Sequence, residues 1–234
     1  MQVAKLTMNK RNRLIPIPKA AISEVHDYDV IISSREIFLS GYDREEYLEV
    51  DYRVATRFIK NLRVLESLSS DPIVIHQYSA GGEWESGMAI YDAIQHSEAS
   101  FVFICHGLAA SMGSIIPQAV HGKGVRLTMP NCYWCIHEGE QSMEGTVKQV
   151  RSYYEFCKLS GTRMYDIYSD VCYETGAYFQ DIPKAKVKEF VKHRLESKED
   201  WWLTAEDAVI YGFVDGIIGS ENYESILDAR DHLV

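Results

Sequence analysis

The sequence predicts an α/β fold in which a mainly parallel sheet is built from strands that alternate with helices. Two apolar segments, residues 73–75 and 101–105, each lead into a glycine-containing segment and then into a helical pattern. This alternation is typical of βαβ units, whose strands run parallel. The 234 residues, 46% hydrophobic and 25% charged, suit one globular core.

The first part of the chain is expected to form an arm, two strands and a helix. Residues 1–27 have no clear periodicity and predict an irregular N-terminal arm before a single domain over residues 28–234. Strands are expected near residues 29–32 and 36–39. An amphipathic helix is expected over residues 51–69, where apolar side chains recur at helical spacing: Val54, Phe58, Leu62, Leu65 and Leu68.

A serine lies at a predicted strand-to-helix turn in the middle of the chain. The apolar strand is expected to stop at His106 and Gly107, after which small residues lead to Ser111. Backbone N–H groups at a helix N-terminus can stabilise an oxyanion, so Ser111 is placed like a nucleophile. An N-cap role or close packing explains this serine equally well. Pro117 is expected to end or kink the helix after little more than one turn.

The second half of the chain predicts further strands and three helices. Residues 132–137 form a strand that ends at His137, and a polar loop follows. Thr146 can cap a long helix, and Thr204 begins a capping box. The remaining expected elements are a tyrosine-rich region to Phe179, a basic helix opened by Pro183, a short helix ended by Gly212, and a strand over residues 213–218.

A serine nucleophile requires an imidazole base and a carboxylate that orients the base. His137 is the histidine best placed by topology, and His76 and His106 are weaker candidates. Periodicity does not select the carboxylate, which stays open among four residues of the C-terminal region: Glu199, Asp200, Asp207 and Asp215.

Six short motifs occur in an order that resembles the ClpP family, the proteolytic subunits of the Clp protease. The resemblance covers about residues 28–220 and is closest between Ser79 and His137. We interpret the chain as a divergent member; a specialised phage or plastid peptidase is compatible with the sequence, which does not separate it from a general protease. The motifs are REIFLSG from Arg35, SAGG from Ser79, GMAIYD from Gly87, GLAASMG from Gly107, MPN from Met129 with Ile136-His137, and WLTAEDA from Trp202 with Tyr211-Gly212.

This resemblance implies a crotonase-like ClpP fold of repeated β-β-α units, with a protruding handle at about residues 146–198. It also implies a serine endopeptidase that cleaves unfolded proteins or short peptides inside a closed ring. Ser111 matches the family's nucleophile, His137 its general base and Asp200 its acid. The backbone groups that match are Gly82 and Met112 for the oxyanion hole, and Gly81 and Gly82 for substrate binding.

The resemblance further implies a homo-oligomer, a tetradecamer of two heptameric rings, and a ring-shaped ATPase partner. ATP would be used by that partner, so no cofactor is expected on this chain. Three departures bear on the site and its surroundings: Ala80 replaces a usual proline, one extra residue lies between Ser111 and His137, and the segment before Asp200 is longer. The N-terminal arm does not clearly resemble the family's corresponding segment.

Composition excludes several other classes of protein. A net charge of −10 disfavours a nucleic-acid partner, although five basic residues precede Glu24. No apolar run is long enough to span a membrane, and no secretory signal is recognisable, which predicts a cytoplasmic protein, with the plastid stroma or a phage-infected cell as variants. Cys132 and Cys135 would point to opposite faces of a strand, so no metal site is expected.

Two other functions remain open. A non-catalytic subunit of a mixed Clp ring would share the fold, although such subunits typically lack part of the triad that this chain keeps. A crotonase-type acyl-CoA enzyme would use paired amides to hold an enolate oxygen. That reaction needs no serine nucleophile and leaves His137 and Asp200 unexplained.

Overall fold

The computed structural model describes residues 25–40, 42–43, 46–47, 49–231 and 233. Most of the expected N-terminal arm, residues 1–24 with their basic cluster, lies outside the described residues. Residues 25–28 form a helical turn that leads into the first strand.

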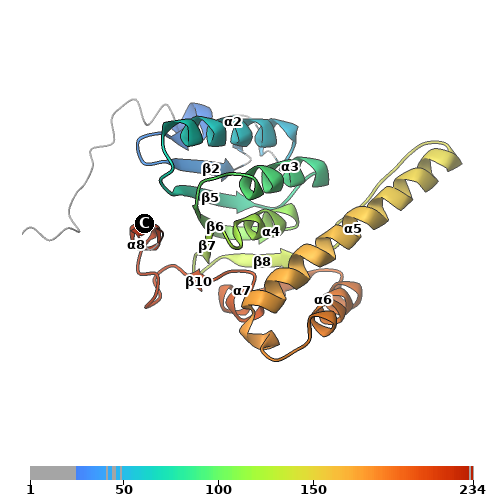
Figure 1. Cartoon of the computed structure of the whole chain (residues 1–234). Coiled ribbons are helices and arrows are strands. Elements are labelled where there is room, and N and C mark those ends of the chain that lie inside the picture. The colour runs from blue at the N-terminus through green and yellow to red at the C-terminus, as the bar shows by residue number, and fades with distance from the viewer. Residues whose placement is uncertain (1–24, 41, 44–45, 48, 232, 234) are drawn as a thin grey trace, which may run out of the picture.

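An eight-stranded sheet forms the centre of the molecule, in the order β1-β2-β5-β6-β7-β10, with β8 paired to β6 and β9 paired to β8 (Figure 1). Only the β1–β2 and β8–β9 pairs are antiparallel, which confirms the mainly parallel sheet. The strands are β1 (Val30–Ile31), β2 (Glu36–Ser40), β5 (Ile73–Ser79), β6 (Phe101–Ala110), β7 (Gly124–Thr128), β8 (Tyr133–Ile136), β9 (Trp201–Leu203) and β10 (Gly216–Ile217). Strands β3 (Tyr42–Asp43) and β4 (Glu46–Tyr47) form a separate hairpin.

The two faces of the sheet are covered by different helices. On β6, Phe101 and Phe103 belong to the main core cluster, together with residues of α2 (Tyr52–Leu68), α3 (Trp84–Gln95) and α4 (Met112–Ile115). Val102 and Ile104 point to the opposite face, as alternation along a strand requires. There they cluster with Ala229 of α8 (Ile226–Asp231), a C-terminal helix that the sequence analysis missed.

Helix α2 confirms the predicted amphipathic helix almost residue for residue. The Asp51 side chain caps it by accepting from the N–H groups of Arg53 and Val54. Phe58, Leu62 and Leu65 are buried and Val54 is partly buried, but Leu68, the last residue of the helix, is exposed. The buried face of the helix therefore ends at Leu65.

The predicted turn at His106 and Gly107 was also wrong, because β6 continues to Ala110. Gly107 has a left-handed φ of +59° and lies under the Tyr78 ring, where a Cβ would come within 2.8 Å of that ring. Beyond this irregular point, β6 leaves β7 and pairs with β8. The strand therefore carries the chain directly to Ser111.

The expected stop at Pro117 is confirmed. Helix α4 has four residues, and a 3-10 helix, η2 (Ile116–Val120), replaces it at the proline. A proline inside an α-helix clashes with the preceding turn and lacks the N–H donor, which explains the change.

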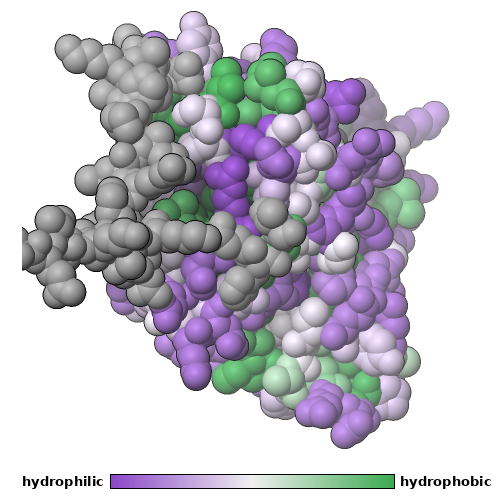
Figure 2. Space-filling model, turned by 60° about the vertical axis from the view of Figure 1, so that its left-hand side comes forward, coloured by the Kyte–Doolittle hydropathy of each residue, from purple (hydrophilic) through white to green (hydrophobic). Residues whose placement is uncertain are grey.

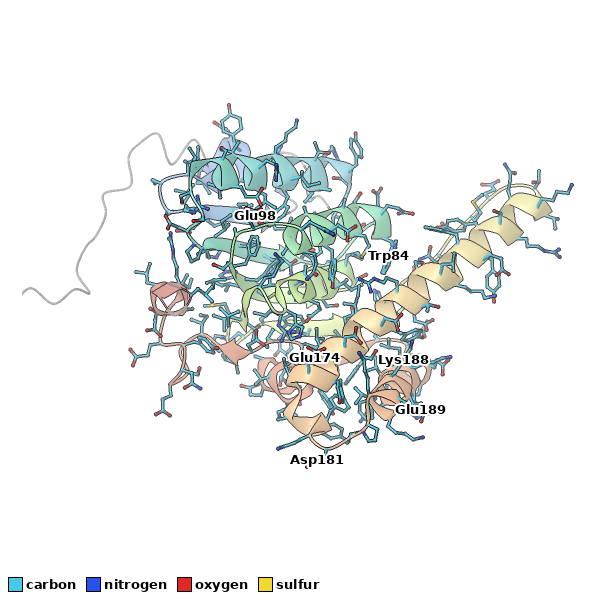
Figure 3. The ribbon with its side chains drawn as sticks, viewed as in Figure 1. Trp84, Glu98, Glu174, Asp181, Lys188 and Glu189 are labelled. Atoms are coloured by element: carbon cyan, nitrogen blue, oxygen red, sulfur yellow. The ribbon has the colours of Figure 1, made fainter. Side chains whose placement is uncertain are left out.

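A long handle projects from the sheet. Helix α5 (Val147–Thr175) starts at a Thr146–Gln149 capping box and runs through the predicted tyrosine-rich region as one 29-residue helix. Its far end extends away from the body, whereas α6 (Lys184–Lys198) packs against its base (Figure 1). Trp84, at the start of α3, lies on the side that faces α5 (Figure 3). The chain returns from α5 to strand β9 through η3 (Ala177–Phe179) and α6, and α7 (Ala205–Tyr211) follows β9.

One face of the molecule shows how hydrophobic and hydrophilic residues are distributed on the surface. On the face shown in Figure 2, hydrophobic residues gather mainly at the upper and lower ends and hydrophilic residues fill most of the area between them. Among the described residues, no helix is both long enough and apolar enough to cross a membrane.

A buried arginine joins the C-terminal part of the chain to the sheet. Arg126 of β7 is fully buried and forms an ion pair with Asp215 at 2.5 Å. It also donates to the Gln118 side chain at 2.7 Å, the Gly212 carbonyl at 3.1 Å and the Thr175 hydroxyl at 3.1 Å. A buried charge is stable only when it is paired and hydrogen-bonded, so these contacts fix three elements around β7.

We predict that Asp215→Ala lowers the free energy of unfolding by about 3 kcal/mol, because it leaves the Arg126 charge without its carboxylate. Glu189→Gln is the control, since Glu189 pairs with Lys186 at an exposed position. That change should stay within about 0.5 kcal/mol. Urea unfolding at matched protein concentration measures both, and equal effects of the two variants would contradict the assigned role of Arg126.

Candidate active site

Ser111 occupies a sharp turn between β6 and α4. Its φ of +52° and ψ of −127° are unusual for a residue with a side chain, and such strain persists only where the surroundings enforce it. The Ser111 N–H donates to the Cys135 carbonyl of β8 at 3.0 Å, and the Ser111 carbonyl accepts from the Ser114 N–H at 2.8 Å and the Ser114 hydroxyl at 2.7 Å. Neighbouring strands and helix therefore hold Ser111 at the helix N-terminus, as the sequence predicts.

Two consecutive glycines lie against this turn. A Cβ on Gly81 would come within 2.5 Å of the Ser111 Cβ, and a Cβ on Gly82 would come within 2.4 Å of the Val50 backbone. Both glycines also have positive φ values, +112° and +149°. Only glycine combines this backbone with these contacts, so the segment after β5 passes directly beside Ser111.

His137 and Asp200 are brought together by the pairing of β8 with β9. Ile136 is paired with Trp201 in this antiparallel ladder, so the residues just beyond the pair lie next to each other. The His137 Nδ1 and the Asp200 Oδ1 are 3.1 Å apart. An ionised carboxylate accepts from Nδ1–H, which leaves Nε2 of a neutral ring as the proton acceptor.

The other carboxylates that the sequence left open have different partners. Asp215 pairs with Arg126, and Asp207 closes the capping box of α7 with Thr204. Glu199 is the C-cap of α6 and is exposed. Among the described residues, Asp200 is the one of the four candidates that is hydrogen-bonded to a histidine.

The weaker histidine candidates lie elsewhere on the sheet. His76 Nδ1 is 3.1 Å from His106 Nε2, and His76 Nε2 is 3.1 Å from the Glu36 carboxylate. The hydrogen bond with His76 is the main cause that lowers the pKa of Glu36, while burial lowers the pKa of His106. His76 and His106 therefore belong to a separate polar cluster with Glu36.

Ser111 and His137 are not hydrogen-bonded to each other in this structure. The Nε2 of His137 is buried and has no hydrogen-bond partner among the described residues. The structure thus pairs the histidine with Asp200 and places Ser111 against Gly81 and Cys135. Catalytic hydrogen bonds are often long in ligand-free enzymes and form only when substrate is bound.

Cys135 also lies at this site, which the sequence analysis missed. Its sulfur, a His137 ring nitrogen and an Asp200 oxygen all lie within 4.8 Å of one another. The sequence feature that could have predicted this is the spacing of Cys135 and His137, which are two residues apart along an extended segment and so lie on one face. Burial, together with the Asp200 charge, raises the pKa of the Cys135 thiol to about 11, so the thiol is protonated at neutral pH.

Comparisons with known proteins agree with this geometry. The family model described as Clp protease matches residues 20–221. The chain is 30% identical over 187 residues to ATP-dependent Clp protease proteolytic subunit 2 of Pseudomonas aeruginosa, an alignment covering 80% of this chain and 82% of that protein. It is 33% identical over 182 residues to proteolytic subunit 3 of Synechococcus sp. strain CC9902, covering 76% and 84%.

A solved structure shows the same fold. A ClpP1 mutant from Listeria monocytogenes superposes with a TM-score of 0.65 at 23% identity, covering 82% of this chain and 95% of that chain. The resemblance stated from the short motifs and the ClpP fold are both confirmed. The chain belongs to the Clp protease family.

Proposed function

We propose that this chain is a serine endopeptidase subunit in which Ser111 is the nucleophile, His137 the general base and Asp200 the acid that orients the base. The observation that carries the assignment is the His137–Asp200 hydrogen bond at 3.1 Å, formed on the strand pair whose β8 member also binds the Ser111 backbone. The relatives named as proteolytic subunits support the reaction class. The substrates are unfolded proteins or short peptides.

The proposed reaction has two balanced steps. Ser111 Oγ attacks the peptide carbonyl while His137 Nε2 takes its proton, and the imidazolium then gives this proton to the departing amine. Water next attacks the Ser111 ester, losing a proton to His137, which returns it to Ser111 as the acid product leaves. A movement of the Ser111 or His137 side chain must first bring Oγ within hydrogen-bond distance of Nε2, which has no partner among the described residues.

Two backbone N–H groups would hold the oxyanion. Met112 is the first residue of α4, where an N–H has no acceptor within its own helix. The Ser111 N–H is already used by the Cys135 carbonyl, so it does not serve this purpose. Gly82 supplies the second proposed donor, and Gly81 and Gly82 together would pair with an extended substrate. No cofactor takes part in these steps.

We predict that Asp200→Asn lowers kcat/KM for a fluorogenic peptide by roughly 10³-fold to 10⁴-fold, since an amide neither holds the required tautomer nor stabilises the imidazolium. Ser111→Ala should abolish turnover. The matched control is Glu199→Gln, which removes the neighbouring exposed carboxylate and should retain kcat/KM within about twofold. Near-full activity in Asp200→Asn would require a different acid.

Activity is expected to depend on assembly. We propose that α5 forms a contact between subunits, because it projects from the body and exposes large apolar side chains: Val147, Val150, Tyr154, Phe156 and Leu159. Single exposed apolar residues are ordinary, but several on one protruding helix indicate a surface that is covered. A tetradecamer of two heptameric rings is the proposed assembly.

We predict that Leu159→Glu lowers the assembly mass measured by light scattering, since it places a charge in the proposed contact. Leu159 is 71% exposed in the single chain. Leu227→Glu is the control, because Leu227 is 72% exposed but lies on α8 at the opposite side of the sheet. If Leu159→Glu assembles like the control, α5 does not form this contact.

A pocket over strands β2, β5 and β6 is the proposed docking site for a ring-shaped ATPase. It has a volume of about 430 Å³ and is lined by Glu36, Phe38, His76, Gln77, Tyr78 and His106. Phe38 stacks on His76, and Tyr78 is half exposed, so a partner could insert an apolar side chain. Candidate unfoldases that neither bind nor stimulate degradation of an unfolded protein would count against this docking.

A further inference from the structure

Three different metal-ligand types meet beside Ser111: a thiol, an imidazole and a carboxylate. The Cys135 sulfur, a His137 ring nitrogen and an Asp200 oxygen lie within 4.8 Å of one another. Two strands fix this arrangement, because Cys135 lies on β8, His137 directly follows β8, and Asp200 immediately precedes β9. The pairing of two strands therefore places the three residues next to one another.

The spacing allows coordination with only small movements. Ligand atoms in a tetrahedral zinc site lie roughly 3.3–3.8 Å apart, given bond lengths near 2.0–2.3 Å. Cys135 is buried and held in the strand, whereas the Asp200 side chain is 51% exposed and can rotate toward an ion. The exposed side of the cluster also gives an entry path from solvent, which a usable site requires.

The ligand types select the class of metal. Thiolate and imidazole favour zinc and cobalt, whereas magnesium and calcium prefer sites made of oxygen. We propose that Cys135, His137 and Asp200 bind a zinc-type divalent cation, which leaves one tetrahedral position for water. The ion replaces the thiol proton of Cys135. This proposal departs from the expectation of no metal site, which considered only Cys132 and Cys135 as a pair.

Binding would switch off peptide hydrolysis. The ion would occupy the histidine that serves as general base and the carboxylate that orients it, so His137 could no longer take the Ser111 proton. This consequence rests on the proposed function, whereas the metal site itself does not. The cation would therefore act as a reversible inhibitor, removed by a chelator.

Cobalt chloride titrated into the Ser111→Ala protein tests binding without any activity measurement. We expect one Co²⁺ per chain, with a thiolate-to-cobalt charge-transfer absorption band. Cys135→Ala in the same background should lose the band. Cys132→Ala is the matched control, because this equally buried cysteine of the same CxxC segment should keep it. Asp200→Asn, which removes a half-exposed ligand, should weaken binding at least roughly tenfold.

Zinc chloride added to active protein tests the inhibition. Micromolar Zn²⁺ should stop peptide turnover reversibly, and Mg²⁺ should not. Cys135→Ala should be at least tenfold less sensitive to zinc, with inhibition expressed relative to that variant's own turnover without metal. A missing charge-transfer band, or a band that survives Cys135→Ala, would overturn the site. Equal zinc inhibition of the wild type and Cys135→Ala would overturn its role in inhibition, whatever the outcome for Ser111.

Discussion

The antiparallel pairing of β8 with β9 is the interaction on which the site depends. It joins segments that are 63 residues apart in the chain and sets His137 against Asp200 at their ends. The same β8 strand pairs with the last residues of β6 and accepts the Ser111 N–H through Cys135. One strand of four residues therefore positions all three proposed catalytic side chains. The long segment that contains α5 and α6 is inserted between β8 and β9.

Ser111 combines local strain with close packing. The positive φ turns the chain abruptly from strand to helix, and Gly81 allows a second backbone segment to approach its Cβ. Such strain costs on the order of 1–3 kcal/mol and must be offset by the surrounding sheet, including the buried Arg126 and Asp215 pair. Favourable interactions elsewhere in the fold thus offset the strained backbone dihedral of Ser111, which presents the serine hydroxyl at the site.

Much of this arrangement was predictable from the sequence, for identifiable reasons. The helix begun at Asp51 and the capping boxes at Thr146 and Thr204 follow from local hydrogen bonding. The end of β6 was not predicted, because its last residues are extended by pairing with β8, a tertiary contact. Periodicity alone could not choose Asp200, since that choice depends on the register of β8 with β9. The CxxC pattern pairs Cys135 with Cys132, whereas the contact that matters is with His137, two residues away, and it depends on the strand pairing.

The central claim is that Ser111 is an activated nucleophile within an assembled subunit. Size-fractionated protein treated with a fluorophosphonate and weighed as intact chains tests this directly. The account predicts one adduct per chain in the oligomeric fraction of the wild type and none in Ser111→Ala. An adduct that persists in Ser111→Ala, or an assembled wild type that stays unmodified, would contradict it.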